Sequence, residues 1–288
     1  MNNNIDFSKY IGPLKPCIVC GGGNFTLFAK EGCMEARKCD DCSMISTNPY
    51  LTEEGVRIFY ESYFDSRINS EEDLFELRKS QYINDRDFLL NFIDSGRILD
   101  IGSSGGHFLS NFDSNLWERE GIDLTKNSAD FAKQNFDIKV HTGNVLNYKF
   151  DKRFDVISMR GVIEHFVNPG ELLKHLPNLL NPGGFFYITA TPDGDSFAFE
   201  VYREKWKLFT PLEHVHFFTE KSLTALLGND FELIIQAHPY IDTPYANKEM
   251  DYKQIMDDIV TKKSGGKIEQ FSPPFIGSMI TALWRYNP

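Results

Sequence analysis

The chain contains the stretch Arg97-Ile98-Leu99-Asp100-Ile101-Gly102-Ser103-Ser104-Gly105-Gly106-His107-Phe108, in which an apolar run ends in a glycine-rich turn. A second short apolar run ends in an acid at Asp123, 21 residues after Gly102. Glycines let the backbone approach a ligand closely, and the following helix presents free N–H groups. The second acid can accept hydrogen bonds from ribose hydroxyls. The stretch therefore predicts the first half of a nucleotide-binding α/β domain.

The glycine-rich turn suits a pyrophosphate poorly. The dinucleotide fingerprint requires Gly-x-Gly-x-x-Gly, but Ser104 stands at the second glycine and Asp100 ends the strand beside the turn. A carboxylate there repels a pyrophosphate and attracts a cation, such as the ammonium and sulfonium of S-adenosylmethionine. At Asp100, Gly102 and Gly106 the stretch resembles the first motif of class I S-adenosylmethionine-dependent methyltransferases, Asp-x-Gly-x-Gly-x-Gly. Taken alone, the motif also fits a strand-to-helix turn in another α/β protein.

The rest of the chain extends this resemblance. A buried strand is predicted at Asp155–Met159, a helix at Pro169–Leu180 and a strand at Phe185–Thr189, with Asn-Pro-Gly-Gly turning between the last two. Two closing strands are predicted at Phe231–Tyr240 and Ile276–Tyr286. The resemblance implies an α/β fold: a Rossmann-like, seven-stranded class I methyltransferase sheet with helices on both faces.

The resemblance also implies a set of cofactor-binding residues. Asn144 stands where the family usually has an acid that contacts the adenine amino group, and it can still form a hydrogen bond. Tyr82 and Arg86 share one helical face and could reach the cofactor carboxylate. The residues expected at S-adenosylmethionine are Asp100, Gly102, Ser103, Ser104, Gly106, Asp123, Leu124, Asn144, Val145, Arg160 and Tyr82.

Four cysteines near the N-terminus form a second motif. Cys17-x2-Cys20 and Cys39-x2-Cys42 are separated by 18 residues, which is typical of a four-cysteine zinc site. Four protein ligands leave no open position on the ion, so a structural zinc is expected. Free thiols and disulfides are the alternatives, and no export signal supports disulfides. A ribbon that reads RNA is disfavoured, because residues 1–50 carry five acids against five Lys and Arg.

These motifs divide the chain into segments. Residues 1–50 form the expected zinc ribbon and residues 51–95 a helical linker or cap. Residues 96–288 form the methyltransferase domain, with 241–271 as an insertion between the last strands.

Candidate catalytic residues lie after the predicted strand Phe185–Thr189. A histidine is the natural base near neutral pH, and an adjacent carboxylate can orient it. The segment Pro211–Thr219 resembles the Glu-His segment of bacterial deoxysugar C-methyltransferases, which also begin with two cysteine pairs. The resemblance implies that His214 is a base assisted by Glu213, with His216 and His165 in reserve. The alternative is that His214 and His216 form structural hydrogen bonds on a loop.

Glu164-His165 resembles part of a motif in some quinone-pathway O-methyltransferases. Those enzymes carry Glu-x-x-Glu-His here and are thought to hold a divalent cation. Gly161 occupies the position of the first glutamate in this chain, so that metal site is not expected.

The composition narrows the class of acceptor. The chain has 288 residues and a formal net charge of −11 at pH 7. A nucleic-acid polymer is therefore disfavoured as substrate, since phosphate binding needs a basic surface. No apolar run is long enough for a membrane span, and we expect a cytoplasmic protein.

The sequence predicts an S-adenosylmethionine-dependent methyltransferase that acts on a hydroxyl or an acidic carbon of a small molecule. A sugar, including a nucleotide-linked sugar, is the expected acceptor. The alternatives are a zinc-ribbon scaffold with a non-catalytic cofactor fold, an RNA methyltransferase and an NAD-dependent oxidoreductase. The oligomeric state is left open.

Overall fold

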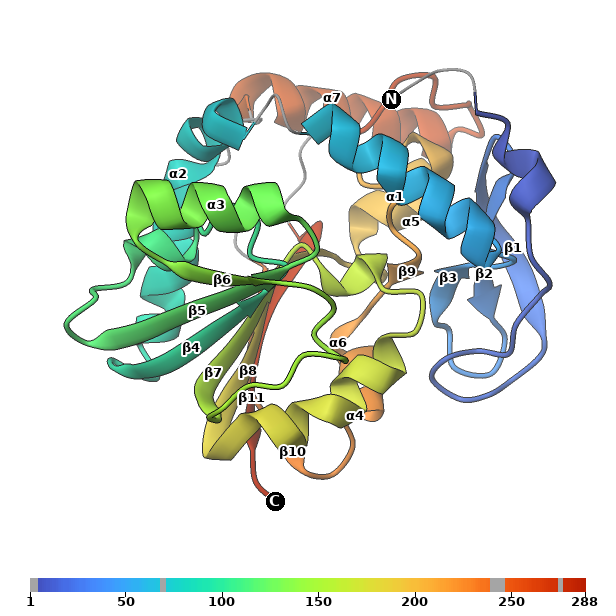
Figure 1. The fold of residues 1–288 in the computed structure, drawn as a ribbon. Coiled ribbons are helices and arrows are strands. Elements are labelled where there is room, and N and C mark those ends of the chain that lie inside the picture. The colour runs from blue at the N-terminus through green and yellow to red at the C-terminus, as the bar shows by residue number, and fades with distance from the viewer. Residues whose placement is uncertain (1–4, 68–70, 239–246, 274–276) are drawn as a thin grey trace.

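A seven-stranded sheet forms the centre of the protein (Figure 1). The computed structural model describes residues 5–67, 71–238, 247–273 and 277–288. The strands follow the order β10-β11-β8-β7-β4-β5-β6. Their bounds are β4 Gly96–Ile101, β5 Trp117–Asp123, β6 Lys139–Thr142, β7 Phe154–Arg160, β8 Leu180–Pro192, β10 Phe231–Ala237 and β11 Met279–Tyr286. The pairs from β6 to β8 are parallel, whereas β11 is antiparallel to both β8 and β10. This is the predicted class I methyltransferase sheet.

Alternate residues of the strands enter two hydrophobic clusters on opposite faces of the sheet, because successive strand side chains point to opposite sides. Ile98 and Val156 pack in one cluster with side chains of α2 (Glu71–Leu90) and α3 (Lys126–Phe136). Leu99 and Ile157 pack in the other with α4 (Pro169–Leu179) and α6 (Glu220–Leu227). The expectation of helices on both faces is confirmed.

Two local expectations about turns are corrected. No α-helix follows the glycine-rich turn; a 3-10 helix, η2, covers Leu109–Asn111, and β5 begins soon after it at Trp117. The short segment buries Phe108 and Phe112 and leaves no length for a longer helix. The helix before Asn-Pro-Gly-Gly ends at Leu179 as expected, but β8 already starts at Leu180 and includes this segment, across which its pairing with β7 shifts register.

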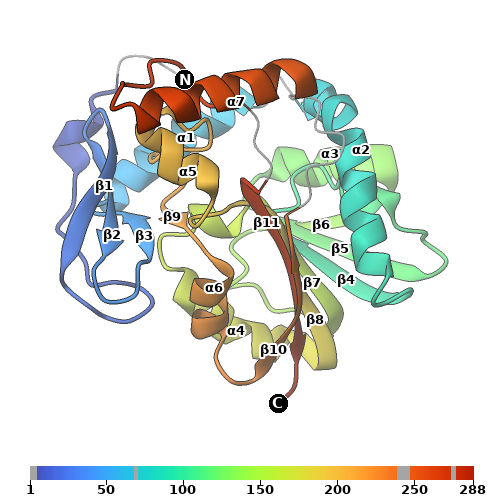
Figure 2. The ribbon, with the colours of Figure 1, turned by 180° about the vertical axis from the view of Figure 1, so that it is seen from behind.

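The four-cysteine segment lies in a second, smaller sheet. It consists of β1 (Phe25–Glu31), β2 (Met34–Cys39), β3 (Ile45–Thr47) and β9 (His216–Phe217), in that order. β9 comes from the far side of the chain and pairs antiparallel with β3. Figure 2 shows this pairing beside α5 (Phe197–Tyr202), so the ribbon is joined directly to the segment that follows β8.

Further helices come from the predicted helical segment and from the predicted insertion. The helical segment predicted at 51–95 contains α1 (Glu53–Arg67) and α2. The predicted insertion contains α7 (Lys248–Lys263), which runs along one side of the molecule from the ribbon toward α2 (Figures 1 and 2). Residues 241–246 of that insertion, with Tyr240 and Ile276 of the predicted closing strands, lie outside the described residues. Short 3-10 helices are η1 (Phe7–Tyr10), η3 (Ile163–His165) and η4 (Arg203–Lys205). Within the described segments, no helix combines the length and apolar character that crossing a membrane requires.

Candidate active site

A cavity of about 1230 Å³ opens at the carboxyl ends of β4, β5, β7 and β8. One half is lined by the glycine-rich turn and the ends of β5 and β7, and the other by η3 and the loop after η4. We call these the cofactor half and the acceptor half. All predicted cofactor residues except Gly106 line the cavity. Gly106 is needed for packing instead: its φ is +76°, and a Cβ there would come within 3.2 Å of the Ala132 side chain of α3.

The glycine-rich turn bends toward Asp123. The backbone N–H of Ser104 donates to Asp123 Oδ2 over 3.0 Å, and that of Thr125 donates to Asp123 Oδ1 over 3.0 Å. Ser104 has a φ of +47°, in the left-handed region that favours glycine, which agrees with the glycine of the family motif. Asp123 is thereby held at the end of β5, where its carboxylate lines the cavity. A carboxylate held in this place fits the predicted contact with ribose hydroxyls.

Asp100 lies near the end of β4, two residues before Gly102. It is 2% exposed and accepts a hydrogen bond of 2.7 Å from Ser158 Oγ. Burial raises the pKa of Asp100 to about 7, although Ser158 and Arg160 oppose the shift. A carboxyl group of this kind ionises readily when a cation approaches. The buried hydroxyl of Ser103 also lines the cavity, and no hydrogen-bond partner for it is found among the described residues. Both features fit a cationic, hydroxyl-bearing cofactor.

The lining of the cofactor half includes an ion pair with little solvent exposure. Arg160 Nε donates to Asp85 Oδ2 over 2.7 Å, and the guanidinium lies 4.5 Å from the Tyr82 ring centre. The hydroxyl of Thr189 donates to Asp85 Oδ1 over 2.8 Å. The role of Asp85 was not predicted from the sequence, because an acidic residue within a charged helix is usually exposed to solvent. Its neighbour Arg86 bonds the Asn111 carbonyl and does not line the cavity.

The adenine side of the cofactor half is formed after β6. Asn144 is exposed and lines the cavity. Its Oδ1 accepts a hydrogen bond from the Leu146 backbone N–H over 3.0 Å, which fixes the side chain within the turn after β6. Val145 is buried and Leu124 is 57% exposed. Two apolar side chains beside an amide suit a flat base with an exocyclic polar group.

The acceptor half brings together His165 and His214 from segments that are far apart in the sequence. Their ring centres are 5.0 Å apart. His165 Nδ1 lies 2.9 Å from the Glu213 carbonyl oxygen, and His214 Nδ1 lies 2.8 Å from that of Leu208. A carbonyl only accepts, so both Nδ1 atoms carry the proton and the neutral rings have their lone pair on Nε2. Each imidazole is therefore set up to accept a proton or bind a cation through Nε2.

Glu164 lies beside the two histidines. It is 1% exposed, and Thr191 Oγ1 donates to its Oε2 over 3.2 Å. Burial raises the pKa of Glu164 to about 8. One ligand atom each from Glu164, His165 and His214 lies within 4.8 Å of the others, so the three could hold a metal ion. The absence of a glutamate at position 161 therefore does not exclude a metal site, because His214, from another segment, supplies a third ligand atom.

The other predicted catalytic residues occupy different surroundings. Glu213 lines the cavity, whereas His216 does not. His216 is 3% exposed, with Nδ1 2.9 Å from Ser46 Oγ, and burial lowers its pKa to about 4. His216 thus lies at the junction of ribbon and core, which agrees with the structural alternative weighed for the histidine pair.

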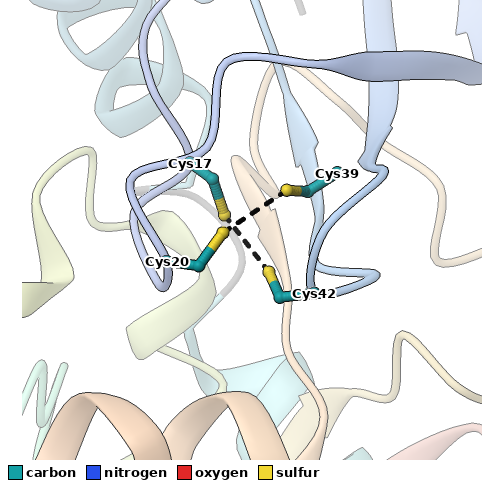
Figure 3. A group of neighbouring side chains, drawn as sticks. All are labelled: Cys17, Cys20, Cys39 and Cys42. Atoms are coloured by element: carbon teal, nitrogen blue, oxygen red, sulfur yellow. Dashed lines mark hydrogen bonds between the residues drawn. The ribbon is translucent and has the colours of Figure 1, made fainter.

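The four predicted zinc ligands converge at one end of the ribbon, as Figure 3 shows. Cys17 Sγ lies 3.5 Å from Cys42 Sγ, and Cys20 Sγ lies 3.6 Å from Cys39 Sγ. Tetrahedral zinc with Zn–S bonds of about 2.3 Å places its sulfurs about 3.8 Å apart. None of the chain's five cysteines forms a disulfide. The donor set and spacing fit a tetrahedral zinc ion.

Comparisons with known proteins agree with this fold and cavity. A family profile described as "Methyltransferase domain" matches residues 74–234, more than half of the chain. The ubiquinone biosynthesis O-methyltransferase of Bradyrhizobium diazoefficiens is 26% identical over 169 residues, which cover 55% of this chain and 67% of that protein.

Two solved structures are similar in fold. One is a Thermotoga maritima protein described as an S-adenosylmethionine-dependent methyltransferase and possible histamine N-methyltransferase. It has a TM-score of 0.52 and 18% identity, over 78% of this chain and 98% of that one. The other, a candidate methyltransferase of Bacillus halodurans C-125, has a TM-score of 0.51 and 18% identity over 73% of this chain and 100% of that one. The chain belongs to the methyltransferase domain family and is an S-adenosylmethionine-dependent methyltransferase.

Proposed function

We propose that this enzyme transfers the methyl group of S-adenosylmethionine to a hydroxyl, or an acidic carbon, of a small-molecule acceptor such as a nucleotide-linked sugar. His214 is the general base, and Glu213 assists it. The observation that carries the proposal is the convergence of His165 and His214, each with Nδ1 within hydrogen-bond distance of a carbonyl oxygen, at the acceptor half of a cavity whose other half fits the cofactor.

In this mechanism the cofactor supplies an activated methyl group. The chain must hold the acceptor in line with it and receive the acceptor's proton. When the cofactor is bound, Asp123 would hold its ribose and Asp100 would attract its positive charge. His214 Nε2 takes the proton from the acceptor oxygen or carbon as the methyl transfers. Its Nδ1–H keeps donating to the Leu208 carbonyl, which fixes the tautomer. A carboxyl oxygen of the buried Glu164 lies within 4.8 Å of a His214 ring nitrogen, so Glu164 stabilises the imidazolium once its own proton has left.

The size of the cavity supports a small-molecule acceptor. Ligand cavities are commonly about 300–1,000 Å³, and this one, at about 1230 Å³, has room for a second molecule beside the cofactor. A hydroxyl is the favoured target because the Bradyrhizobium relative is named as an O-methyltransferase. The net charge of −11 disfavours an RNA substrate.

We also propose that Cys17, Cys20, Cys39 and Cys42 hold a structural zinc ion as four thiolates. Four protein ligands leave no coordination position for the acceptor. Thiols kept free of disulfides fit the reducing conditions of the cytoplasm, which we propose as the location of the protein.

The first experiment is a calorimetric titration with S-adenosylhomocysteine, with NADH as the control. We expect micromolar binding of the first and none of the second. A panel of nucleotide-linked sugars and phenolic hydroxyl compounds is then incubated with methyl-labelled S-adenosylmethionine and the enzyme. Labelled product from one acceptor class supports the proposal. Cofactor binding with no transfer to any acceptor would favour a scaffold with a non-catalytic cofactor fold.

The same assay separates a base from a metal ligand at His214. Turnover that persists in the presence of a divalent chelator supports the base. Turnover that is lost with the chelator and restored by Mg²⁺ or Mn²⁺ would make Glu164, His165 and His214 a metal site instead.

A further inference from the structure

The zinc ribbon contacts the backbone on which His214 lies. The segment Leu212–Val215 runs between the core of the methyltransferase and the ribbon. On the core side, the Val215 backbone N–H donates to the Glu164 carbonyl over 2.9 Å. On the ribbon side, the Thr47 backbone N–H donates to the Val215 carbonyl over 2.8 Å. One residue after His214, the chain is therefore held from both sides.

Two ribbon side chains reach the same segment. The Tyr50 hydroxyl donates to the Leu212 carbonyl over 2.7 Å, and Thr47 Oγ1 lies 3.4 Å from the His214 carbonyl. Tyr50 and Thr47 are 7% and 3% exposed, so water has little access to replace these contacts. Because Leu212 precedes His214 by two residues and Val215 follows it, the ribbon binds the backbone on both sides of the proposed base.

The segment is also packed against the ribbon by apolar side chains. Val215 lies in one buried cluster with Met34 of β2, Tyr50, Leu51 and Phe59 of α1. The cluster bridges the ribbon, the helical cap and the loop that carries His214. Displacing the ribbon would therefore expose this cluster as well as break the hydrogen bonds.

The contacts continue to the cysteine cluster. Cys39 ends β2, and its backbone N–H donates to the Met44 carbonyl immediately before β3. β3 then pairs with β9, where Ser46 lies opposite His216. The strand that contacts the backbone at the proposed base thus follows directly after the cysteine pair Cys39 and Cys42.

We propose that Tyr50, assisted by Thr47, is a positioning residue that fixes His214 in the acceptor half of the cavity. The ribbon then takes part in catalysis without touching the acceptor. This inference rests on the proposed role of His214 for its catalytic meaning, whereas the position of the imidazole is testable by itself.

The test records ring C–H signals of ¹³C-histidine-labelled protein saturated with S-adenosylhomocysteine. The chain has seven histidines, and the His214 signal is assigned by its absence in His214→Gln. The variants are Tyr50→Phe, which removes one hydroxyl, and Thr47→Val. The matched control is Tyr202→Phe, which removes a buried hydroxyl that donates to Asp258 Oδ2 over 2.7 Å and so joins α5 to α7 rather than the ribbon to the segment Leu212–Val215.

We expect Tyr50→Phe to shift the His214 signal by several linewidths, and Thr47→Val to shift it less. The signal of His175, a half-buried residue of α4, should stay in place. In Tyr202→Phe the His214 signal should not move, even where the melting temperature falls as much as in Tyr50→Phe. An unmoved His214 signal in both ribbon variants would overturn the proposal.

Turnover separates this inference from the proposed function. With an acceptor found in the panel, Tyr50→Phe should lose about tenfold in kcat, which corresponds to one repositioned catalytic group. Its affinity for S-adenosylhomocysteine should be unchanged. Full turnover in His214→Gln would contradict the proposed base, while the His214 signal would still decide whether Tyr50 positions that residue.

Discussion

The two halves of the cavity are built in different ways. The cofactor half consists of consecutive turns at the ends of adjacent parallel strands, so Asp100 and Asp123 are positioned within one sheet, by β4, β5 and the Ser158 hydroxyl of β7. The acceptor half combines η3, the loop after η4 and support from a separate sheet. Its histidines, at 165 and 214, are oriented by carbonyls of yet other residues, Glu213 and Leu208.

This difference shows that one sheet can supply the whole cofactor site. The acceptor site, by contrast, is assembled from separate segments, each of which can change without a change in the others. A change in the ribbon or in the loop at 208–215 alters the acceptor half without touching β4 or β5. It should therefore be possible to impair cofactor binding and methyl transfer separately.

Removal of zinc should have the largest effect of all, because it destabilises the ribbon that supports the acceptor half. Structural zinc contributes about 10–16 kcal/mol to small zinc domains, so losing part of this should lower the melting temperature by about 10 °C or more. The variant is Cys39→Ser, measured by thermal unfolding and by zinc content. Cys33→Ser is the matched control, because this exposed cysteine lies outside the cluster. Equal melting temperatures for the two variants would contradict a structural zinc ion.

Replacement of the proposed base should damage catalysis and leave cofactor binding intact. His214→Ala should lower kcat by about a hundredfold or more, the usual contribution of a general base. Affinity for S-adenosylhomocysteine, measured by calorimetry, should stay within a factor of two. His216→Ala is the comparison, since His216 lies outside the cavity lining. A larger loss of kcat in His216→Ala than in His214→Ala would reverse their proposed roles.

Replacement of Asp123 should have the opposite effect: cofactor binding should weaken while kcat is retained. Asp123→Ala removes a charged acceptor for the ribose hydroxyls, worth about 1.5–3 kcal/mol, so S-adenosylhomocysteine should bind at least about tenfold more weakly. At saturating cofactor, kcat should change little. Unaltered affinity would show that the ribose is bound elsewhere.

The affinity for S-adenosylmethionine should rise with pH. The pKa of Asp100 is raised to about 7 by burial, and the cationic cofactor favours the ionised carboxylate. Below pH 7, binding must release a proton. Between pH 6 and pH 8 the ionised fraction rises about tenfold, and the apparent affinity should rise with it. Asp100→Asn should flatten this dependence, and a pH dependence that persists in Asp100→Asn would assign it to another group.

The sequence predicted the cofactor half because its information is local. The turn from Asp100 to Gly106 and the acid at Asp123 are each recognised from a few adjacent residues. The seven-stranded sheet followed from the order of apolar runs. The expected helix after the turn was wrong, since helix length there is set by where β5 begins, at Trp117.

The acceptor half was only partly predictable. The Glu213-His214 pair was identified by resemblance, and the cysteine spacing identified the cluster. The pairing of β3 with β9 had no sequence signal, because two residues are too few to show a strand period. Asp85 was missed for a similar reason: its role depends on Arg160 and Thr189, which only the folded chain brings to it.

The pairing of β3 with β9 also sets an order of events during synthesis. Ser46 and His216 are 170 residues apart. At about 5–20 residues per second, the ribosome needs about 10 to 30 s to deliver the partner strand. For that time β3 is an exposed sheet edge on the nascent chain, with the backbone groups of Ile45–Thr47 open to other strands. The ribbon therefore completes its sheet only after β8 and the proposed catalytic loop have been synthesised.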